Sequence, residues 1–400
     1  MALSMCPIRK GAPTQGLEII LGLKPIALKI EEHALKSMLN VLPYTNGNST
    51  WNGIGHGKNS YGHLKWGKDQ LLKMGIHEIS FDKTNVLNLN QKFSVDLESF
   101  SSGLPVHHSD IAAYTDGSKL TGAAGYGFGI TKGNTVISRG NGSLDIENSV
   151  FQSEVLAIQK CCEKLIEIDT NSVTIFSDSR SAISSLAGLK VKSKTVNNCI
   201  EKLNILGTKS EVIIKWIKAH CSHPGNEYAD YEAKLGTSNI DNKIVVPPPI
   251  SWAKSKISQA IEKKWCQNWQ NYGKARQTKI WFPGINKKAT NSLIKLNRME
   301  LGTAIAMLTG HNRLKKHEAI VNQDDKDSLC RFCLEDDESA WHIIGECPAL
   351  TSVRRDSFQT ILGILENPPQ WKTTQFLSFL RNAKLAEINK GDHHYLPNTE

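Results

Sequence analysis

The sequence predicts an α/β fold with a mixed β-sheet for the middle of the chain, residues 107–236. Three strand-like runs come first in this region, and helical and strand-like stretches then alternate. Consecutive strands pair as antiparallel hairpins, whereas strands separated by a helix pair in parallel, so the two patterns together indicate a mixed sheet. Hydrophobic residues make up 40% of the 400 residues, which allows a buried core and excludes a wholly disordered chain.

Each element of this middle region is predicted from the spacing of its apolar residues. Short apolar runs bounded by Gly, Asn or Ser predict strands, and apolar residues three or four apart predict helices. In chain order, we expect strands at 111–115, 126–131 and 135–139, a helix at 149–168, a strand at 172–177, helices at 180–186 and 195–206, a strand at 212–217 and a helix at 226–235.

The two flanks differ in sequence pattern from the middle region. Residues 1–105 are expected to form a mixed N-terminal extension, and three consecutive prolines indicate a linker at 237–250. Beyond this linker, the sequence predicts a helical region at 251–320 with helices at 255–269 and 289–308, a Cys/His module at 325–355 and a tail at 356–400.

The positive charge of the chain lies outside the middle region. Its net charge is +9, yet residues 107–236 hold 14 basic and 14 acidic side chains. The flanks therefore carry the whole excess, with 34 basic against 25 acidic residues. A polyanion such as nucleic acid would be attracted mainly by the flanks. A soluble basic protein without such a partner is the alternative interpretation.

The lengths of the apolar runs and the number of cysteines indicate the cellular compartment of the protein. No run approaches 18 apolar residues, so we expect no transmembrane helix and no membrane partner. The apolar stretch at 17–23 is interrupted by Glu18, which does not fit a secretory signal peptide. The 9 cysteines, an odd number, then indicate a reducing intracellular compartment with free thiols or metal ligands, and nucleus and cytoplasm both stay open.

Four carboxylates stand where the predicted elements of the middle region converge. Asp116 ends the first strand and Asp178 ends the strand at 172–177. Glu154 lies one turn into the helix between them, and Asp230 is on the last helix. Side chains at the ends of adjacent strands of an α/β sheet share one crevice. Any one of the four acids could be a surface charge or a helix cap.

Acids gathered in one crevice repel one another unless cations neutralise them. Mg²⁺ is a hard ion that takes oxygen ligands and keeps several waters. Two such ions about 3.5–4 Å apart would serve phosphodiester chemistry, because one activates a water and the other steadies the leaving oxygen.

The local sequences around these acids resemble those of the type 1 ribonuclease H family. The matching stretches are YTDGS at 114–118, FQSE at 151–154, FSDSRSA at 176–182, WIKAH at 216–220 and PGNEYAD at 224–230. The resemblance implies a ribonuclease H-like fold for residues 107–236, with a five-stranded mixed sheet flanked by helices. It also implies an endonuclease that uses two Mg²⁺ ions, for which Mn²⁺ could substitute. Such an enzyme cleaves the RNA strand of RNA–DNA hybrids and leaves 5′-phosphomonoesters.

The resemblance further implies roles for individual residues. The metal ligands would be Asp116, Glu154, Asp178 and Asp230. His220 would lie on a mobile loop and assist proton transfer or product release. His223, in the same loop, ranks below it because His220 follows the strand directly. Asn226 and Glu227 are expected to cap and orient the last helix.

Contacts to the hybrid are a separate expectation. Recognition of a hybrid needs contacts to 2′-hydroxyls on one strand and to deoxyribose on the other. The candidates are Gly117, Ser118, Gln152 and Ser179. Gln152 and Ser179 could equally be helix-cap residues. The sequence departs from the family at Ala219, where Gly is usual, and at Cys221, where Ser or Ala is common, and neither change removes a proton carrier.

A second group of metal-binding residues follows in the C-terminal flank. Cys330-x₂-Cys333-x₈-His342-x₄-Cys347 offers three thiols and one imidazole, the donor set of a structural tetrahedral Zn²⁺ site. Free thiols near a helix are the alternative. A zinc module here would stabilise a segment too small for a core of its own, or contact nucleic acid.

The flanks resemble the C-terminal part of a non-LTR retrotransposon polyprotein. The resemblance rests on GAPT at 11–14, LEIILGL at 17–23, GHL at 62–64, WHII at 341–344 and Arg354. The aromatic-x-Asp-Asp sequence of a polymerase is absent, so we expect no DNA synthesis. Two functions remain: a Mg²⁺-dependent hybrid ribonuclease, or a non-catalytic nucleic-acid-binding remnant of such a polyprotein.

Overall fold

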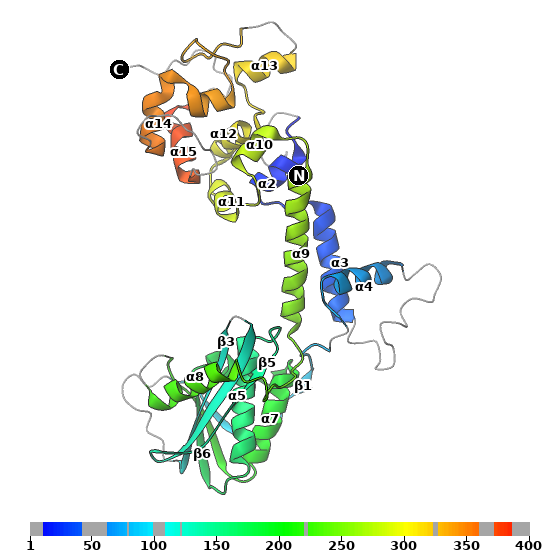
Figure 1. Ribbon diagram of the computed structural model, residues 1–400, viewed down its shortest axis with the longest axis vertical. Coiled ribbons are helices and arrows are strands. Elements are labelled where there is room, and N and C mark those ends of the chain that lie inside the picture. The colour runs from blue at the N-terminus through cyan, green and yellow to red at the C-terminus, as the bar shows by residue number, and fades with distance from the viewer. Residues whose placement is uncertain are drawn as a thin grey trace. The chain divides into compact units, whose positions relative to one another are not determined.

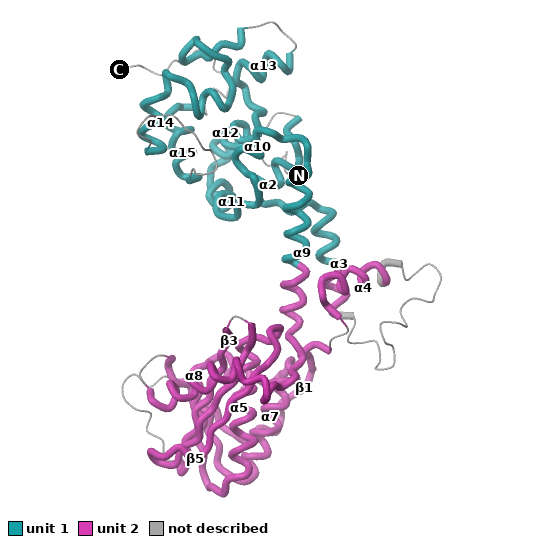
Figure 2. The backbone as a smooth tube through the Cα atoms, viewed as in Figure 1, with its two compact units in different colours: residues 1–33, 258–400 teal, residues 34–257 magenta. Residues whose placement is uncertain are grey.

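The computed structural model describes residues 11–41, 62–77, 80–98, 109–120, 122–219, 223–322, 327–359 and 372–385. The chain forms two compact units, one of residues 1–33 with 258–400 and one of residues 34–257 (Figure 2). This grouping differs from the expected domains, because the extension predicted at 1–105 is divided between the two units. Among the described helices, none combines the length and the apolar character needed to span a bilayer.

The unit of residues 34–257 contains a six-stranded mixed sheet in the order β2-β8-β6-β3-β4-β5 (Figure 1). Antiparallel pairing joins β3 to β4 and β4 to β5, whereas β3, β6, β8 and β2 pair in parallel. The strands are β2 Ser94–Asp96, β3 Ile111–Leu120, β4 Ala123–Lys132, β5 Thr135–Leu144, β6 Ser172–Ser177 and β8 Glu211–Trp216. The predicted α/β fold with a mixed sheet is confirmed.

The sixth strand was not expected from the sequence. The resemblance implied five strands, and β2 is added at the sheet edge from residues that precede the predicted domain. It has three residues, none of them buried, so it lacks the apolar pattern that marks a strand. A second short ladder pairs β1 Val86–Leu87 with β7 Lys190–Val191.

Helices cover both faces of the sheet. On one face, α5 Val150–Leu165 and α7 Lys194–Leu206 bury their apolar residues in one large cluster. On the other side, α8 Pro224–Gly236 packs on β3 and β4 over a smaller cluster that includes Tyr114 and Phe176. The short helix α6 Arg180–Leu186 follows β6 directly.

Glycines let α8 lie directly against β4. A Cβ atom on Gly127 would come within 2.2 Å of the backbone nitrogen of Ala233, and one on Gly125 within 2.4 Å of the nitrogen of Thr237. Real Cβ atoms do not approach backbone so closely, so any other residue would push the helix away. The glycine-rich sequence of this strand therefore sets the position of α8 and of the acid it carries.

We expect Gly127→Ala to destabilise this unit by at least about 3 kcal/mol, because the added methyl group meets helix backbone that cannot rotate away. Thermal unfolding measures the change. Gly273→Ala is the matched control, since nothing lies within 4 Å of a Cβ at that position. Equal melting temperatures for the two variants would contradict the close packing of α8 on β4.

The stretch predicted as a linker packs against the sheet unit. Val246 is 9% exposed and belongs to the large apolar cluster. Asn148 Nδ2 donates to the carbonyl of Val246 at 3.1 Å, and Gln152 Nε2 donates to that of Pro247 at 2.8 Å. Prolines have no N–H to satisfy, so buried side-chain donors to the carbonyls suffice to hold this segment.

The unit of residues 1–33 and 258–400 is helical in its described part. The predicted helix at 255–269 is confirmed within α9, whereas the one predicted at 289–308 is two helices, α11 and α12. The chain turns between them, and Asn297 caps α12 by accepting from the N–H groups of Met299 and Glu300 at 3.0 Å. The principal helices are α2 Thr14–Ile20, α9 Ile250–Asn271, α10 Arg276–Trp281, α11 Lys287–Leu293, α12 Arg298–Thr309, α13 Lys315–Asn322, α14 Thr351–Phe358 and α15 Thr373–Asn382.

Two further α-helices lie wholly or partly in the unit of residues 34–257. The helix α3 Ile26–Val41, like α9, crosses the boundary between the two units. The helix α4 Gly62–Lys73 belongs to the unit of residues 34–257.

Candidate active site

Two of the four acids come from neighbouring parallel strands. Asp178 follows the last residue of β6. Asp116 lies inside β3 and not at its end, because β3 stops pairing with β6 at Thr115 but continues beside β4 to Leu120. The sequence placed the end of the first strand at Asp116, and this is where the parallel pairing with β6 ends, although β3 itself continues. Asp116 consequently stands at the edge of the crevice while its backbone stays held by β4.

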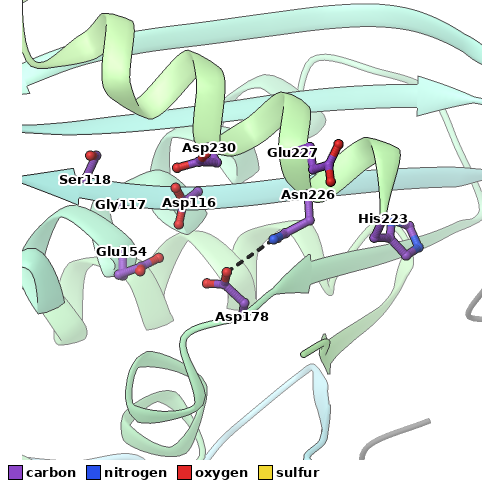
Figure 3. A pocket seen from close by; sticks show the side chains of 9 residues that line it. All are labelled: Asp116, Gly117, Ser118, Glu154, Asp178, His223, Asn226, Glu227 and Asp230. Carbon is purple, nitrogen blue, oxygen red and sulfur yellow. Dashed lines mark hydrogen bonds between the residues drawn. The ribbon is translucent and has the colours of Figure 1, made fainter. Parts of the chain in front are cut away.

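The structure brings all four predicted acids to one pocket (Figure 3). Carboxylate oxygens of Asp116, Glu154 and Asp178 lie within 4.8 Å of one another. Asp230 enters from α8 and accepts a hydrogen bond from Lys234 Nζ at 2.6 Å. The pocket has a volume of about 220 Å³. A strand, two helices and a strand end therefore supply one acid each.

Burial and mutual repulsion disfavour ionised carboxylates here. Burial, the charges of Asp178 and Asp230 and a hydrogen bond with Asp230 raise the pKa of Asp116 to about 7, against the opposing effect of the Gly117 N–H. Burial, followed by the charges of Asp116 and Asp178, raises the pKa of Glu154 well above its usual value. Asp116 and Glu154 are each 7% exposed.

One oxygen of this cluster has no partner in the described part of the chain. Glu154 Oε2 is buried and accepts no hydrogen bond there. A buried carboxylate oxygen normally has a hydrogen bond or a metal ion. Repelling carboxylates around an unsatisfied oxygen form a donor set that fits hard divalent cations such as Mg²⁺.

In the absence of Mg²⁺, we expect Asp116 to make the protein less stable as the pH rises from about 4 to about 7. The folded-state pKa of about 7 lies above the ordinary value of about 3.9, so the folded state binds more protons between them and stability falls with rising pH. At about 1.4 kcal/mol per pH unit, the effect is at most about 4 kcal/mol.

Thermal melting at several pH values measures this dependence, with Asp116→Asn as the comparison. The variant should lose much of the pH dependence, and added Mg²⁺ should stabilise the parent more at high pH than at low pH. Identical pH profiles for parent and variant would contradict the assigned pKa shift.

The four predicted substrate contacts have different surroundings. Gly117 and Ser118 line the pocket (Figure 3). A Cβ on Gly117 would lie 2.4 Å from the backbone nitrogen of Glu154, so glycine allows α5 to approach β3 and places Glu154 in the pocket. Ser179 is the N-cap of α6 and accepts from the N–H of Ala182 at 3.4 Å.

The surroundings of Gln152 differ from those expected of a contact to the hybrid. Its side chain forms a capping box with Ser149 at the start of α5 and also donates to Asp82 Oδ2 at 3.2 Å. The residue is 1% exposed, and both ends of its amide are hydrogen-bonded. Its amide is therefore engaged in holding α5 and the 237–250 segment in place.

The loop before α8 contains two histidines that the sequence analysis considered for proton transfer. His220 lies outside the described residues. His223 lines the pocket at the opposite side from Glu154 in the view of Figure 3. Its ring packs against Tyr114 with 5.2 Å between centroids, and burial lowers its pKa. Neither ring nitrogen has a hydrogen-bond partner in the described part of the chain.

Asn226 is a site residue whose contact was not foreseen. It was expected to cap α8, but its Nδ2 donates to Asp178 Oδ2 at 3.2 Å and orients that carboxylate (Figure 3). The backbone of Asp178 is held as well, since Trp216 Nε1 donates to its carbonyl at 3.0 Å. The spacing of Asn226 and Asp230, four residues apart on one helix face, is the signal that could have found this role.

The Cys/His segment also gathers its side chains. The four candidate ligand atoms lie within 4.8 Å of one another and come from Cys330, Cys333, His342 and Cys347. The Sγ atoms of Cys330 and Cys347 are 3.8 Å apart, and Cys333 Sγ is 3.3 Å from His342 Nε2. This cluster could bind zinc.

Residues around the cluster hold its backbone. Glu338 is 0% exposed and forms two ion-pair hydrogen bonds of 2.8 Å with Arg331, between the first two cysteines. Leu334 has a φ of 59°, which reverses the chain after Cys333. Arg354 is 1% exposed and donates to the carbonyl oxygens of Ile343 and Cys347. Buried charged side chains therefore support the backbone around the cluster.

Comparison with known proteins identifies the central part of the chain. This part of the chain is an α/β domain with an acidic pocket at the end of the parallel pairing of its mixed sheet. Residues 108–238 match the family model described as RNase H, and this part of the chain is an RNase H domain. The match supports nuclease activity on RNA–DNA hybrids at the level of the family. It ends at residue 238, so the resemblance of the flanks to a retrotransposon polyprotein stays a prediction.

Solved structures similar to this chain include two RNase H proteins. One is RNase H1 from the halophilic archaeon Halobacterium salinarum, with 17% identity, 32% of this chain covered, 97% of that chain covered and a TM-score of 0.28. Another is the N-terminal RNase H domain of a Mycobacterium tuberculosis protein fused to maltose-binding protein, with 17% identity, coverages of 32% and 98% and a TM-score of 0.28. No curated protein matches the chain.

Proposed function

We propose that this protein is a Mg²⁺-dependent endoribonuclease that cleaves the RNA strand of RNA–DNA hybrids. The observation that supports it most is the convergence of three carboxylates within 4.8 Å, one of them with a buried oxygen that lacks a hydrogen bond in the described part of the chain. The RNase H family match over residues 108–238 indicates the substrate class.

Each acid has a defined part in this proposal. Asp116, Glu154, Asp178 and Asp230 would hold two Mg²⁺ ions, or Mn²⁺ in their place. Bound there, the metal would supply the positive charge that activates water and stabilises the leaving oxygen. Asn226 fixes the carboxylate of Asp178 in one orientation, since it donates to Oδ2.

The remaining site residues would contact the substrate or assist proton transfer. Gly117 and Ser118 line the pocket and would contact a phosphate or a 2′-hydroxyl group. Ser179, beside Asp178, is a further candidate contact once the hybrid is bound. His220 keeps its proposed role in proton transfer or product release, which suits the ordinary pKa range of histidine.

We also propose that Cys330, Cys333, His342 and Cys347 bind one structural Zn²⁺ ion. The donor set and the 4.8 Å cluster support this. Nε2 of His342 faces the cluster, 3.3 Å from Cys333 Sγ, while Nδ1 lies 3.8 Å from Asp336 Oδ2, a carboxylate able to orient the imidazole.

A cleavage assay on defined duplexes tests the proposed function. The full chain is incubated with Mg²⁺ and an RNA–DNA hybrid whose RNA strand is labelled, beside RNA duplex, DNA duplex and single-stranded RNA. We expect RNA fragments with 5′-phosphate ends from the hybrid alone. Binding of the hybrid without cleavage would support the alternative, a non-catalytic nucleic-acid-binding remnant.

A further inference from the structure

The net positive charge of this protein comes from one segment. Residues 258–316 contain 12 basic and two acidic residues, whereas the rest of the chain holds 36 basic and 37 acidic residues. The whole segment belongs to the unit of residues 1–33 and 258–400. A net charge of +10 in 59 residues thus lies outside the RNase H domain.

The two acids of this segment are already neutralised. Glu262 pairs with Lys287 at 2.7 Å, and Glu300 pairs with Arg381 at 2.7 Å. Seven of the 12 basic side chains are exposed and have no acidic partner in the described part of the chain. They are Lys263, Lys274, Arg276, Lys288, Lys295, Arg298 and Arg313.

Helix stability does not explain where the basic residues stand. Arg276 and Arg298 are the first residues of α10 and α12, and Lys287 and Lys315 are the first residues of α11 and α13. The helix dipole disfavours a cation in the first turn by about 0.3–1 kcal/mol at low salt. Ion pairs with Glu262 and Asp327 offset this cost for Lys287 and Lys315, whereas Arg276 and Arg298 have no acidic partner in the described part of the chain, so folding does not account for these two arginines.

We propose that residues 258–316 form a second nucleic-acid-binding surface, which holds the phosphate backbone of the substrate by charge and without regard to sequence. The identity of this nucleic acid as an RNA–DNA hybrid rests on the proposed function. Clustered lysines and arginines release counterions from a nucleic acid duplex, which gives affinity with a steep salt dependence.

The helix α9 is poorly suited to a membrane surface. Binding to a bilayer needs an exposed apolar helix face beside the basic one. On α9, the large apolar residues Ile261, Trp265 and Trp269 are at most 6% exposed, because they pack inside the unit. Trp269 is further fixed by a hydrogen bond from its Nε1 to the carbonyl of Phe282 at 2.8 Å.

The test is the salt dependence of hybrid binding by the full chain, measured by fluorescence anisotropy with a labelled hybrid. All proteins carry Asp178→Asn, so that cleavage does not intervene. The test variant combines Lys288→Gln, Lys295→Gln and Arg298→Gln. The control removes three lysines of the RNase H domain that lie away from the acidic pocket, by Lys132→Gln, Lys164→Gln and Lys209→Gln.

We expect the test variant to bind about tenfold more weakly at moderate salt, and its slope of log K against log salt to fall by about 2–3, because each phosphate contact contributes about 0.9. The control should lose clearly less. An unchanged slope in the test variant, or an equal loss in the control, would overturn the proposal. So would lost binding to phosphatidylserine vesicles with an unchanged hybrid slope, since that result identifies a membrane surface.

Failure of this inference differs from failure of the proposed function. If the chain without Asp178→Asn does not cleave the hybrid but the test variant loses salt-dependent binding, the second surface stands and the ribonuclease proposal falls. If the chain cleaves and the slopes are equal, the opposite conclusion follows.

Discussion

Asp178→Asn should reduce cleavage of the hybrid by about 10³-fold or more, the scale of losing one preorganised electrostatic contact in a catalytic site. The substitution removes a negative charge while keeping the shape of the side chain. Asn226 Nδ2 donates to Asp178 Oδ2 at 3.2 Å, and the amide oxygen of an asparagine can still accept this hydrogen bond. The loss would therefore come from charge and not from a displaced chain.

Stability separates this effect from misfolding. The charge of Asp178 raises the pKa of both Asp116 and Glu154, so its removal relieves repulsion in the metal-free protein. Asp178→Asn should thus melt at the same temperature as the parent or above it when Mg²⁺ is absent. Asp110→Asn, an exposed acid at the other end of β3, is the matched control and should cleave normally. Retention of a tenth or more of the parent rate by Asp178→Asn would contradict its role.

Cys330→Ser is expected to remove zinc from the protein and to unfold the segment around the Cys/His cluster. Structural zinc sites contribute about 10–16 kcal/mol of binding free energy in zinc-finger peptides, and this energy is lost when a thiol ligand is removed. The cluster also buries Glu338 and His342, which are costly to desolvate unless their backbone framework is held.

Metal analysis and hydrogen exchange measure this second effect. The parent should contain about one zinc per chain, and the amides of residues 327–359 should be protected. In Cys330→Ser both should be lost, while the RNase H domain keeps its protection. Cys266→Ser is the control, since this half-buried thiol lies outside the cluster. A parent without zinc, or a Cys330→Ser protein with unchanged zinc content and protection, would refute the zinc site.

Local patterns in the sequence predicted most of the RNase H domain. The helix α6 and the strand β6 have the predicted bounds, because β-branched runs and Ser caps act within a few residues. The acidic pocket was predicted on two other grounds: the ends of adjacent parallel strands meet by geometry, and the local sequences around all four acids resemble those of the ribonuclease H family.

Contacts between distant segments could not be predicted in this way. Gln152 was taken as a substrate contact because the sequence does not show that Pro247 and Asp82 pack against it. Strand β2 depends on an edge that β8 offers and not on its own three residues. Asn226 reaches Asp178 across 48 positions, a contact that only the packing of α8 on the sheet creates.

The central claim is that the carboxylates of Asp116, Glu154 and Asp178 are gathered to hold hard divalent ions. Crystals of the full chain soaked with Mn²⁺ test it most directly, because anomalous scattering locates the ion without reference to activity. The account predicts anomalous density within coordination distance of these carboxylates, with the unpaired Glu154 oxygen among the ligands. Mn²⁺ bound elsewhere on the chain while this pocket holds none would contradict it.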